Sequence, residues 1–186
     1  TAVSVASAAG LSGGVLKVGV MTDMSGAYSD LSGPGSALAA QMAIEDYGGK
    51  VLGKNIEFVS ADHQNKADIA ANKAREWFDS NQVDVIADLS TSSTALAVME
   101  IANQKNKVTL ISTGGSTKIT NDNCIATNVH WTYDTYALAV GTGKAVVANG
   151  GDTWFFITAD YAFGHSLEGD TANVVTASGG KVLGKV

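Results

Sequence analysis

Two short polar clusters follow apolar, strand-like runs, and they hold the residues best suited to binding a small polar molecule. Residues 89–94 have the sequence LSTSST and follow the run 83–87, while residues 112–117 have the sequence STGGST and follow 108–111. Loops after neighbouring strands of a parallel sheet line a common crevice, and ligands bind there. Hydroxyl groups, glycine backbone and the free N–H groups of a helix N-terminus suit an anionic or polar ligand. Because no strong nucleophile or base accompanies the clusters, they predict binding and not catalysis.

Strand-like and helix-like segments alternate from residue 15 onward. The predicted strands are 16–21, 56–60, 83–87, 108–111 and 124–127. The predicted helices are 36–47, with Ser36 as N-cap, then 66–79, 93–103 and 133–149. Such alternation with short connections predicts an α/β fold: a doubly wound, mainly parallel, flavodoxin-like sheet with helices on both faces.

The pattern restarts after Gly150-Gly151, and this divides the chain into three parts. Residues 1–14 are small and apolar, and Ala6-Ser7-Ala8 fits a signal-peptide cleavage site, so we expect an export-signal remnant or a disordered tail there. Residues 15–150 form a first α/β unit. Residues 151–186 begin a second unit as strand 153–158, helix 163–177 and strand 181–186, and then stop. A chain cut off there would expose apolar surface, so we expect it to self-associate.

Composition excludes several classes of function. The formal net charge is −6 and Lys/Arg residues are not clustered, which argues against nucleic acid as a partner. No run approaches the roughly 18 apolar residues that a membrane span needs. A single cysteine, Cys124, permits no disulfide within the chain, and we expect it to be a small buried hydrophobe. The three histidines lack metal-ligand spacing, and no cofactor is indicated.

Two features of the sequence favour a different class of protein, the signalling domains. Asp23, Asp62 and Asp88 fall near strand ends, where such a trio holds Mg²⁺ in receiver-like domains, although the expected acidic pair and lysine are missing. The segment 33–36, Gly-Pro-Gly-Ser, has the glycines of a nucleotide loop but begins some ten residues after its strand. A receiver-like or nucleotide-binding domain is therefore the alternative prediction.

The order of several motifs resembles one family. These motifs are VGVMTDMSGAYSD, GPGS, AIEDYGG, STSST, ISTGGST and DYAFG. Together they resemble the type I periplasmic solute-binding proteins of ABC importers, in the Leu/Ile/Val-binding-like branch and nearest its aromatic-acid-binding subgroup. The resemblance implies a non-enzymatic, exported protein of two lobes that close on a ligand by hinge motion and deliver it to a membrane permease. The chain would supply the first lobe and the start of the second.

The resemblance also implies where the ligand binds. The family's carboxylate-holding loops correspond here to Thr91 and Ser92 and to Gly114, Gly115 and Ser116. Its apolar cover corresponds to Tyr28 and Leu31, with leucine in place of a family aromatic, and its second-lobe aromatic corresponds to Phe163. Amino-acid-binding members can carry a disulfide where this chain has Asp62-His63 and Ser90, which argues against that subgroup. The implied ligand is a small carboxylate, either an aromatic acid or a hydrophobic or branched-chain amino acid.

Overall fold

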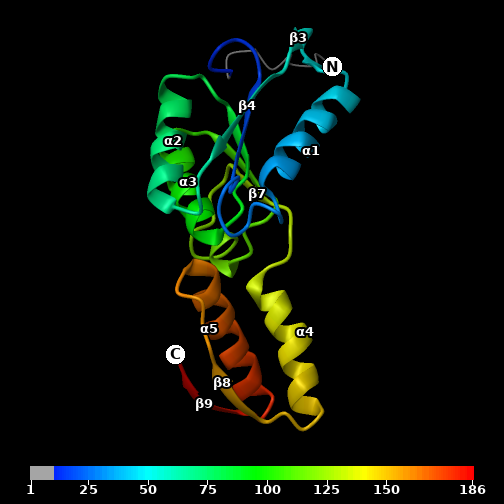
Figure 1. The fold of residues 1–186 in the computed structure, drawn as a ribbon, viewed down its shortest axis with the longest axis vertical. Helices are drawn as coiled ribbons and strands as arrows, with labels where there is room; N and C mark the ends of the chain where they lie inside the picture. Colours follow the sequence, from blue (N-terminus) through cyan, green and yellow to red (C-terminus); the bar gives the residue numbers. More distant parts are fainter. Residues whose placement is uncertain (1–10) are drawn as a thin grey trace, which may run out of the picture.

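The computed structural model describes residues 11–186, and the motif Ala6-Ser7-Ala8 lies outside them. A five-stranded, fully parallel sheet forms the centre of the upper part of the molecule (Figure 1). Its strands are β1 (Lys17–Thr22), β4 (Glu57–Asp62), β5 (Val85–Asp88), β6 (Val108–Ile111) and β7 (Asn128–His130). Their order, β4-β1-β5-β6-β7, is that of flavodoxin-like sheets. The predicted fold class is therefore confirmed.

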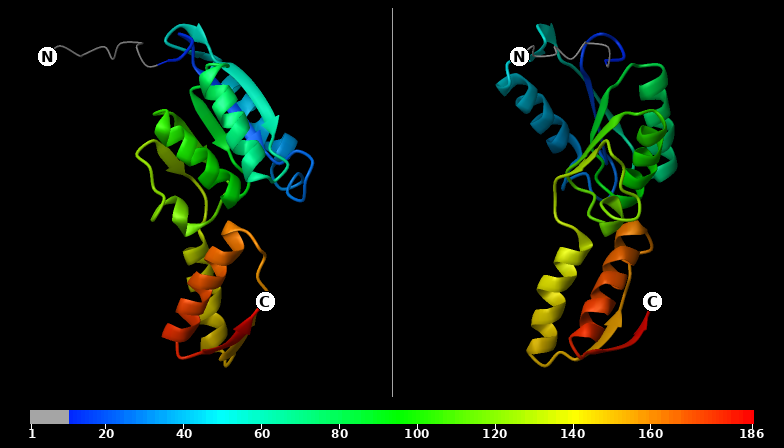
Figure 2. Two further views of the ribbon diagram at one scale, coloured as in Figure 1. Left: turned by 90° about the vertical axis from the view of Figure 1, so that its left-hand side faces the viewer. Right: turned by 180° about the vertical axis from the view of Figure 1, so that it is seen from behind.

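Helices lie on both faces of this sheet (Figures 1 and 2), although Leu110 of β6 and Val129 of β7 remain exposed on the face that carries α1. Helix α1 (Gly33–Asp46) lies on one face, while α2 (Ala67–Asp79) and α3 (Ser92–Gln104) pack together on the other. The main core forms between the sheet and the α2–α3 pair, with Met21, Trp77, Ile86 and Val98 among its buried side chains. The chain changes direction between β1 and β5, so the loops after these strands open toward a crevice at the carboxyl edge.

Three local predictions are wrong. Helix α1 begins at Gly33, with proline in its first turn, so Ser32 and not Ser36 is at the N-cap. The fifth strand is Asn128–His130 and not 124–127, because two of its three pairing residues are polar and the apolar run before them lies in a turn. Cys124 in that turn is exposed and not buried. A small hairpin of β2 (Lys50–Val51) and β3 (Lys54–Asn55) was not expected.

A second α/β unit lies below the sheet (Figure 2). It comprises β8 (Thr153–Phe156), α5 (Ala162–Ala177) and β9 (Lys181–Lys185), with β8 and β9 paired in parallel. Helix α4 (Thr135–Ala148), which precedes residue 150, packs against α5. The division after residue 150 stays a prediction, as does self-association.

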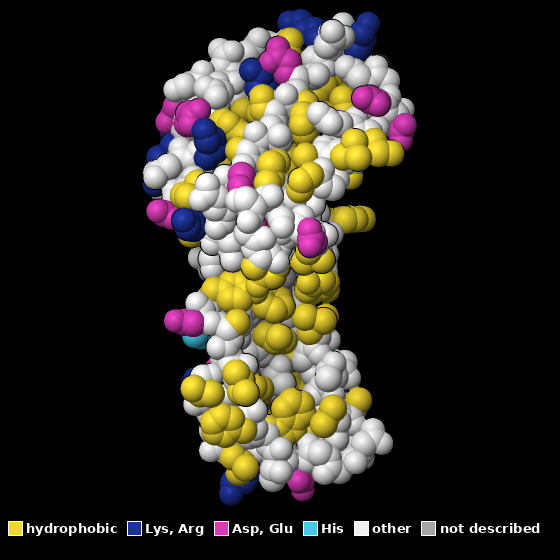
Figure 3. All heavy atoms as spheres, in the orientation of Figure 1, with side chains coloured by type: hydrophobic (Ala, Val, Ile, Leu, Met, Phe, Trp, Pro, Cys, Tyr) yellow, Lys and Arg dark blue, Asp and Glu magenta, His cyan; other side chains and the backbone are white. Residues whose placement is uncertain are grey.

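Hydrophobic side chains gather on the surface of the second unit and at its junction with the first (Figure 3). Phe155, Ile157 and Leu183 are 60%, 89% and 61% exposed, so one face of the β8–β9 pair is apolar and open. A parallel sheet normally has both faces covered. The second unit therefore presents an incomplete core.

Candidate functional site

A pocket of about 100 Å³ lies where the two units meet. The loops after β1, β5 and β6 form one side of it, and the segments that lead into α4 and α5 form the other. It is lined by Tyr28, Leu31, Ser90, Thr91, Ser92, Thr113, Gly114, Gly115, Tyr133, Tyr161 and Phe163. None of these side chains is formally charged. The pocket therefore combines polar backbone and hydroxyl groups with aromatic rings.

Backbone N–H groups are the donors that this pocket offers to an anion. Helix α3 begins at Ser92 without a side-chain cap, so the N–H groups of its first turn have no intrahelical acceptor. Gly114 and Gly115 contribute N–H groups that have no acceptor among residues 11–186. The positive end of the α3 dipole adds a favourable potential. Two independent sets of donors thus meet at one pocket, an arrangement that suits a carboxylate.

Both glycines are there because neighbouring atoms approach too closely for a side chain. A Cβ on Gly115 would lie 3.0 Å from Tyr133 Cε2 and 3.1 Å from Phe163 Cε2. A Cβ on Gly114 would lie 3.2 Å from both the Leu89 carbonyl oxygen and Ala95 Cβ. The loop is thus held between the first unit's core and the aromatic wall.

Aromatic residues close the side of the pocket that faces the second unit. The hydroxyl groups of Tyr28 and Tyr161 are hydrogen-bonded at 2.9 Å, and this bond joins the first unit to the second. Tyr161 also stacks with Phe163, with ring centroids 6.1 Å apart. Burial, and after it the hydrogen bond to Tyr28, raises the pKa of Tyr161 well above its usual value, so its hydroxyl stays protonated. The wall can therefore act as hydrogen-bond donor and as apolar surface.

A buried hydrogen-bond network holds the Tyr28 loop in place. His63 is 1% exposed, and its Nδ1 accepts from the Asn65 N–H at 3.0 Å, so we assign the ring hydrogen to Nε2. His63 Nε2–H then donates to Ser90 Oγ, which also bonds Thr22 Oγ1. Thr22 in turn donates to Ser32 Oγ. Burial lowers the pKa of His63, which keeps the ring neutral and able to accept.

An aspartate at the start of the same loop completes its support. Asp23, which is fully buried, accepts from the N–H groups of Gly26 and Tyr28 at 2.7 and 3.0 Å. Asp62 accepts from Met24 N–H and Ser25 Oγ. These carboxylates, two of the three considered as Mg²⁺ ligands, thus serve the loop backbone. Within residues 11–186, no group of three or more His, Cys, Asp or Glu side chains is placed to hold a metal ion.

Seven of the eight predicted site residues line the pocket: Tyr28, Leu31, Thr91, Ser92, Gly114, Gly115 and Phe163. Ser116 does not, because its hydroxyl caps the short helix η1 (Thr117–Ile119) by accepting from Lys118 N–H. The Ser92 hydroxyl accepts from Ser116 N–H at 3.0 Å, and so it ties the two polar loops together. The hydroxyl groups therefore shape the loops, and the backbone supplies most donors.

Sequence reasoning missed Ser90, Thr113, Tyr133 and Tyr161 as lining residues. Ser90 and Thr113 lie within the two polar clusters, so the clusters already indicated this part of the pocket. Tyr161 is the neighbour of the predicted Phe163. Tyr133 gave no local signal, because it reaches the pocket from the connection before α4.

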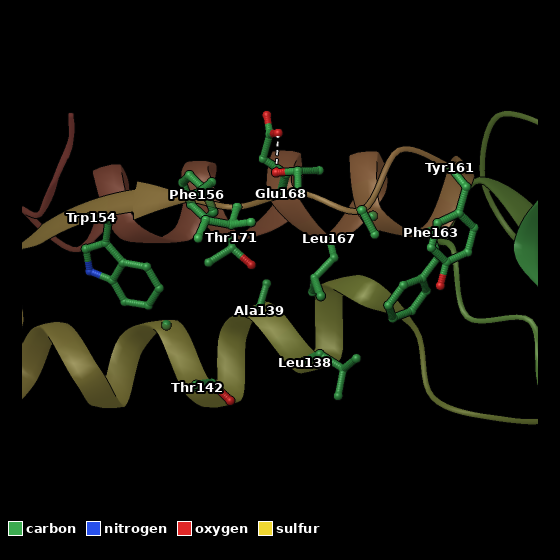
Figure 4. A pocket seen from close by; sticks show the side chains of 15 residues that line it. Leu138, Ala139, Thr142, Trp154, Phe156, Tyr161, Phe163, Leu167, Glu168 and Thr171 are labelled. Atoms are coloured by element: carbon green, nitrogen blue, oxygen red, sulfur yellow. Dashed lines mark hydrogen bonds between the residues drawn. The ribbon is translucent and has the colours of Figure 1, made fainter. Parts of the chain in front are cut away.

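A larger cavity of about 440 Å³ lies between α4, β8 and α5 (Figure 4). It shares Tyr161 and Phe163 with the junction pocket, but most of its lining is apolar, with Leu138, Trp154 and Phe156 prominent. Its one charged residue, Glu168, already accepts from Thr158 Oγ1 at 2.7 Å and pairs with Lys185. Its lining offers no charged group free to pair with a ligand, and its mainly apolar side chains suit the core of the second unit.

A doubly wound sheet has an N–H-lined pocket at its carboxyl edge, and a second α/β unit faces that pocket, which is the architecture of a two-unit α/β protein with its site between the units. Residues 15–186 match the model of the family described as periplasmic binding protein. The chain belongs to this non-enzymatic family. Within the described residues, no helix has the length and apolar character required to cross a bilayer. A comparison with curated proteins found no match.

Solved structures agree with this assignment. A periplasmic binding protein from Burkholderia mallei is 55% identical, with a TM-score of 0.89 over 92% of this chain and 46% of its own length. A branched chain amino acid ABC transporter periplasmic ligand-binding protein from Burkholderia xenovorans is 38% identical, with a TM-score of 0.77 over 92% and 46%. A Rhodopseudomonas palustris solute-binding protein in complex with 3,4-dihydroxybenzoic acid is 25% identical, with a TM-score of 0.79 over 92% and 47%. The chain thus spans about half the length of these relatives.

Proposed function

We propose that this chain contributes the carboxylate-binding part of an extracytoplasmic solute-binding protein, which delivers its ligand to the permease of an ABC importer. The observation that carries the proposal is the meeting of two sets of free N–H groups, from α3 and from Gly114-Gly115, in one uncharged pocket. Such donors bind a carboxylate without a counter-charge. Family membership supports the same role.

The proposed ligand class is an aromatic carboxylate. Tyr28, Tyr133, Tyr161 and Phe163 supply ring surface and hydroxyl groups to the pocket, and none of its lining residues is acidic. The relative that holds 3,4-dihydroxybenzoic acid is consistent with this ligand class. A branched-chain amino acid is the second candidate, because the 38% identical relative is described by that ligand.

Ligand capture requires the two units to separate. The pocket volume of about 100 Å³ is well below the roughly 300 Å³ at which ligand pockets usually begin. The Tyr28–Tyr161 hydrogen bond closes the pocket between the units, so we expect it to break on opening and to form again over the ligand. Closure then removes the ligand from water, which strengthens its bonds to the N–H groups.

The experiment is an NMR titration of the ¹⁵N-labelled chain with benzoate, 4-hydroxybenzoate and L-leucine. Benzoate should shift the amide signals of Ser92, Gly114 and Gly115, and benzamide, the uncharged analogue, should not. Phe163→Ala should weaken binding, whereas Phe155→Ala, which changes an exposed ring elsewhere in the second unit, should not. If no carboxylate shifts these amides at millimolar concentration, the proposed function is wrong. A response to L-leucine alone would select the second candidate.

A further inference from the structure

Asp88 lies between the two polar loops and contacts both. It is the last residue of β5, so the loop that carries Ser90, Thr91 and Ser92 begins directly after it. Its side chain turns toward the end of β6, where Oδ1 accepts from Ser112 Oγ at 2.9 Å and from Thr113 Oγ1 at 2.6 Å. Asp88 itself is 3% exposed and does not line the pocket. The Asp88 side chain thus connects the two loops from outside the pocket.

The backbone at this point is held in a conformation that non-glycine residues rarely adopt. Asp88 has φ of 78° and Leu89 has φ of 58°, and both values lie in the left-handed region. Aspartate tolerates this region better than most residues, whereas leucine does so only where its surroundings compel it. Leu89 is fully buried, and its N–H donates to the Met21 carbonyl oxygen at 2.9 Å. The left-handed pair turns the chain out of β5 and toward the pocket.

We infer that Asp88 is a positioning residue for ligand binding: it fixes the Ser112–Gly115 loop against the Ser90–Ser92 loop, so that the N–H groups of both loops face one ligand. The inference rests on the proposed function, since it concerns the same pocket. Asp88 acts through Thr113, Gly114 and Gly115 and does not touch the ligand. The loop after β6 contains two glycines, and a loop of that kind needs such an anchor to keep its N–H groups aligned.

The two oxygens of Asp88 make the inference testable. Oδ2 is buried and has no hydrogen-bond partner among the described residues, so the side chain holds the loop through Oδ1 alone. Asp88→Asn keeps that acceptor and removes the formal charge, whereas Asp88→Ala removes both. If Asp88 positions the loop, the two variants should differ. If only its charge matters, they should behave alike.

Asp84 provides a matched control at the other end of the same strand. It precedes β5 at the opposite edge of the sheet and is 7% exposed. Its carboxylate accepts from Ser12 N–H, from Lys17 N–H and from Lys107 Nζ. Asp84→Ala therefore removes a buried, hydrogen-bonded carboxylate from β5 without touching either polar loop.

The experiment measures amide hydrogen exchange at Ser116 in the ligand-free chain, because its N–H donates to Ser92 Oγ at 3.0 Å and so reports the contact between the two loops. Benzoate affinity is measured next. In Asp88→Ala, exchange at Ser116 should accelerate, and affinity should fall, each by about tenfold, the equivalent of roughly one lost hydrogen bond. Asp88→Asn should restore slow exchange and bind benzoate at least as tightly as the wild type, because a negative charge near the carboxylate is gone. Asp84→Ala should leave both properties unchanged.

The inference is overturned if Asp88→Ala leaves exchange at Ser116 unchanged, or if Asp84→Ala accelerates it equally. It is also overturned if Asp88→Asn behaves like Asp88→Ala. Should Asp88→Ala not fold, Thr113→Val removes the 2.6 Å bond from the donor side and has to accelerate exchange in the same way. A wild-type chain that binds no carboxylate would contradict the proposed function, and the exchange rates would still decide the role of Asp88.

Discussion

Gly115→Ala tests whether the aromatic wall closes directly onto the ligand loop. The added methyl group would lie 3.0 Å from Tyr133 Cε2 and 3.1 Å from Phe163 Cε2, whereas ordinary contacts begin at 3.4 Å. Gly115 does not have a positive φ, so alanine adds no backbone strain there. Phe163 belongs to α5 in the second unit. The steric conflict with its ring therefore exists only while the two units are closed on each other.

The size of the effect follows from that placement. Overpacking of a tight contact costs about 1–3 kcal/mol. Opening relieves the Phe163 contact, so that part of the cost falls on closure. The Tyr133 contact remains, because the neighbouring Thr135 N–H donates to the Gly115 carbonyl oxygen at 2.8 Å. Benzoate affinity should therefore fall by up to about 150-fold, since each 1.4 kcal/mol is about tenfold. The free energy of unfolding should fall by less than the full cost, partly because alanine reduces the entropy of the unfolded chain.

Gly114→Ala is the matched control, one residue earlier in the same loop. Its methyl group would meet Ala95 Cβ, the Leu89 carbonyl oxygen and Ile111 Cγ2 at 3.2–3.3 Å, and all three belong to the first unit. Its cost of about 1–3 kcal/mol should therefore appear in the free energy of unfolding. Urea denaturation and benzoate titration of both variants separate the two effects. The reasoning is refuted if Gly115→Ala loses as much unfolding free energy as Gly114→Ala and binds benzoate like the wild type.

Three further predictions concern single side chains. The lowered pKa of His63 means that the unfolded chain takes up a proton near pH 6.5 while the folded chain does not, so stability is full above that pH and falls below it. Urea denaturation between pH 7.5 and 5.5 should show that the free energy of unfolding falls by up to about 1.4 kcal/mol per pH unit. His63→Gln should remove this pH dependence, whereas His165→Gln, at an exposed site, should retain it. Tyr28→Phe should lower the pKa of Tyr161, seen by ultraviolet titration, and should weaken benzoate binding by up to about tenfold, as expected for one hydrogen bond between the units. Asp134→Ala should cost about 0.5–2 kcal/mol in thermal denaturation, because its carboxylate caps α4 by accepting from Ala137 N–H at 2.7 Å, and an unchanged melting temperature would contradict that role.

The parts of the fold that the sequence predicted are those with strong local periodicity. Strand β6 was predicted at its observed bounds and α2 to within a residue, because a short run rich in β-branched residues marks β6 and a regular buried stripe marks α2. The β7 prediction failed because an edge strand need not be apolar. Asn128 pairs through its side chain with Thr109, and His130 bonds the Gly114 carbonyl oxygen, so polar contacts select that strand.

The site was predicted in outline, for a similar reason. Ser90–Ser92 and Thr113–Gly115 follow neighbouring strands. The loops after neighbouring parallel strands lie at the same edge of the sheet, so the sequence places these two loops together. Tyr133 and Tyr161 come from connections whose approach depends on how the second unit lies against the first. The sequence did not reveal the hydrogen-bond partners of the Thr91 and Ser116 hydroxyl groups. Thr91 bonds Thr94, and Ser116 caps η1. Which polar groups remain free for a ligand depends on bonds that only three-dimensional structure defines.

The uncharged lining of the pocket determines how capture should respond to ionic strength. Lysine and arginine side chains bind an anion less tightly at higher salt concentration, because dissolved ions screen the attraction. Here the attraction comes from fixed backbone dipoles inside a closed pocket, which mobile ions do not enter. The formal net charge of −6 on this chain adds a long-range field that repels an approaching carboxylate. Added salt screens this repulsion and leaves the short-range attraction of the backbone dipoles intact. We therefore expect benzoate affinity of the chain to stay constant or rise with ionic strength.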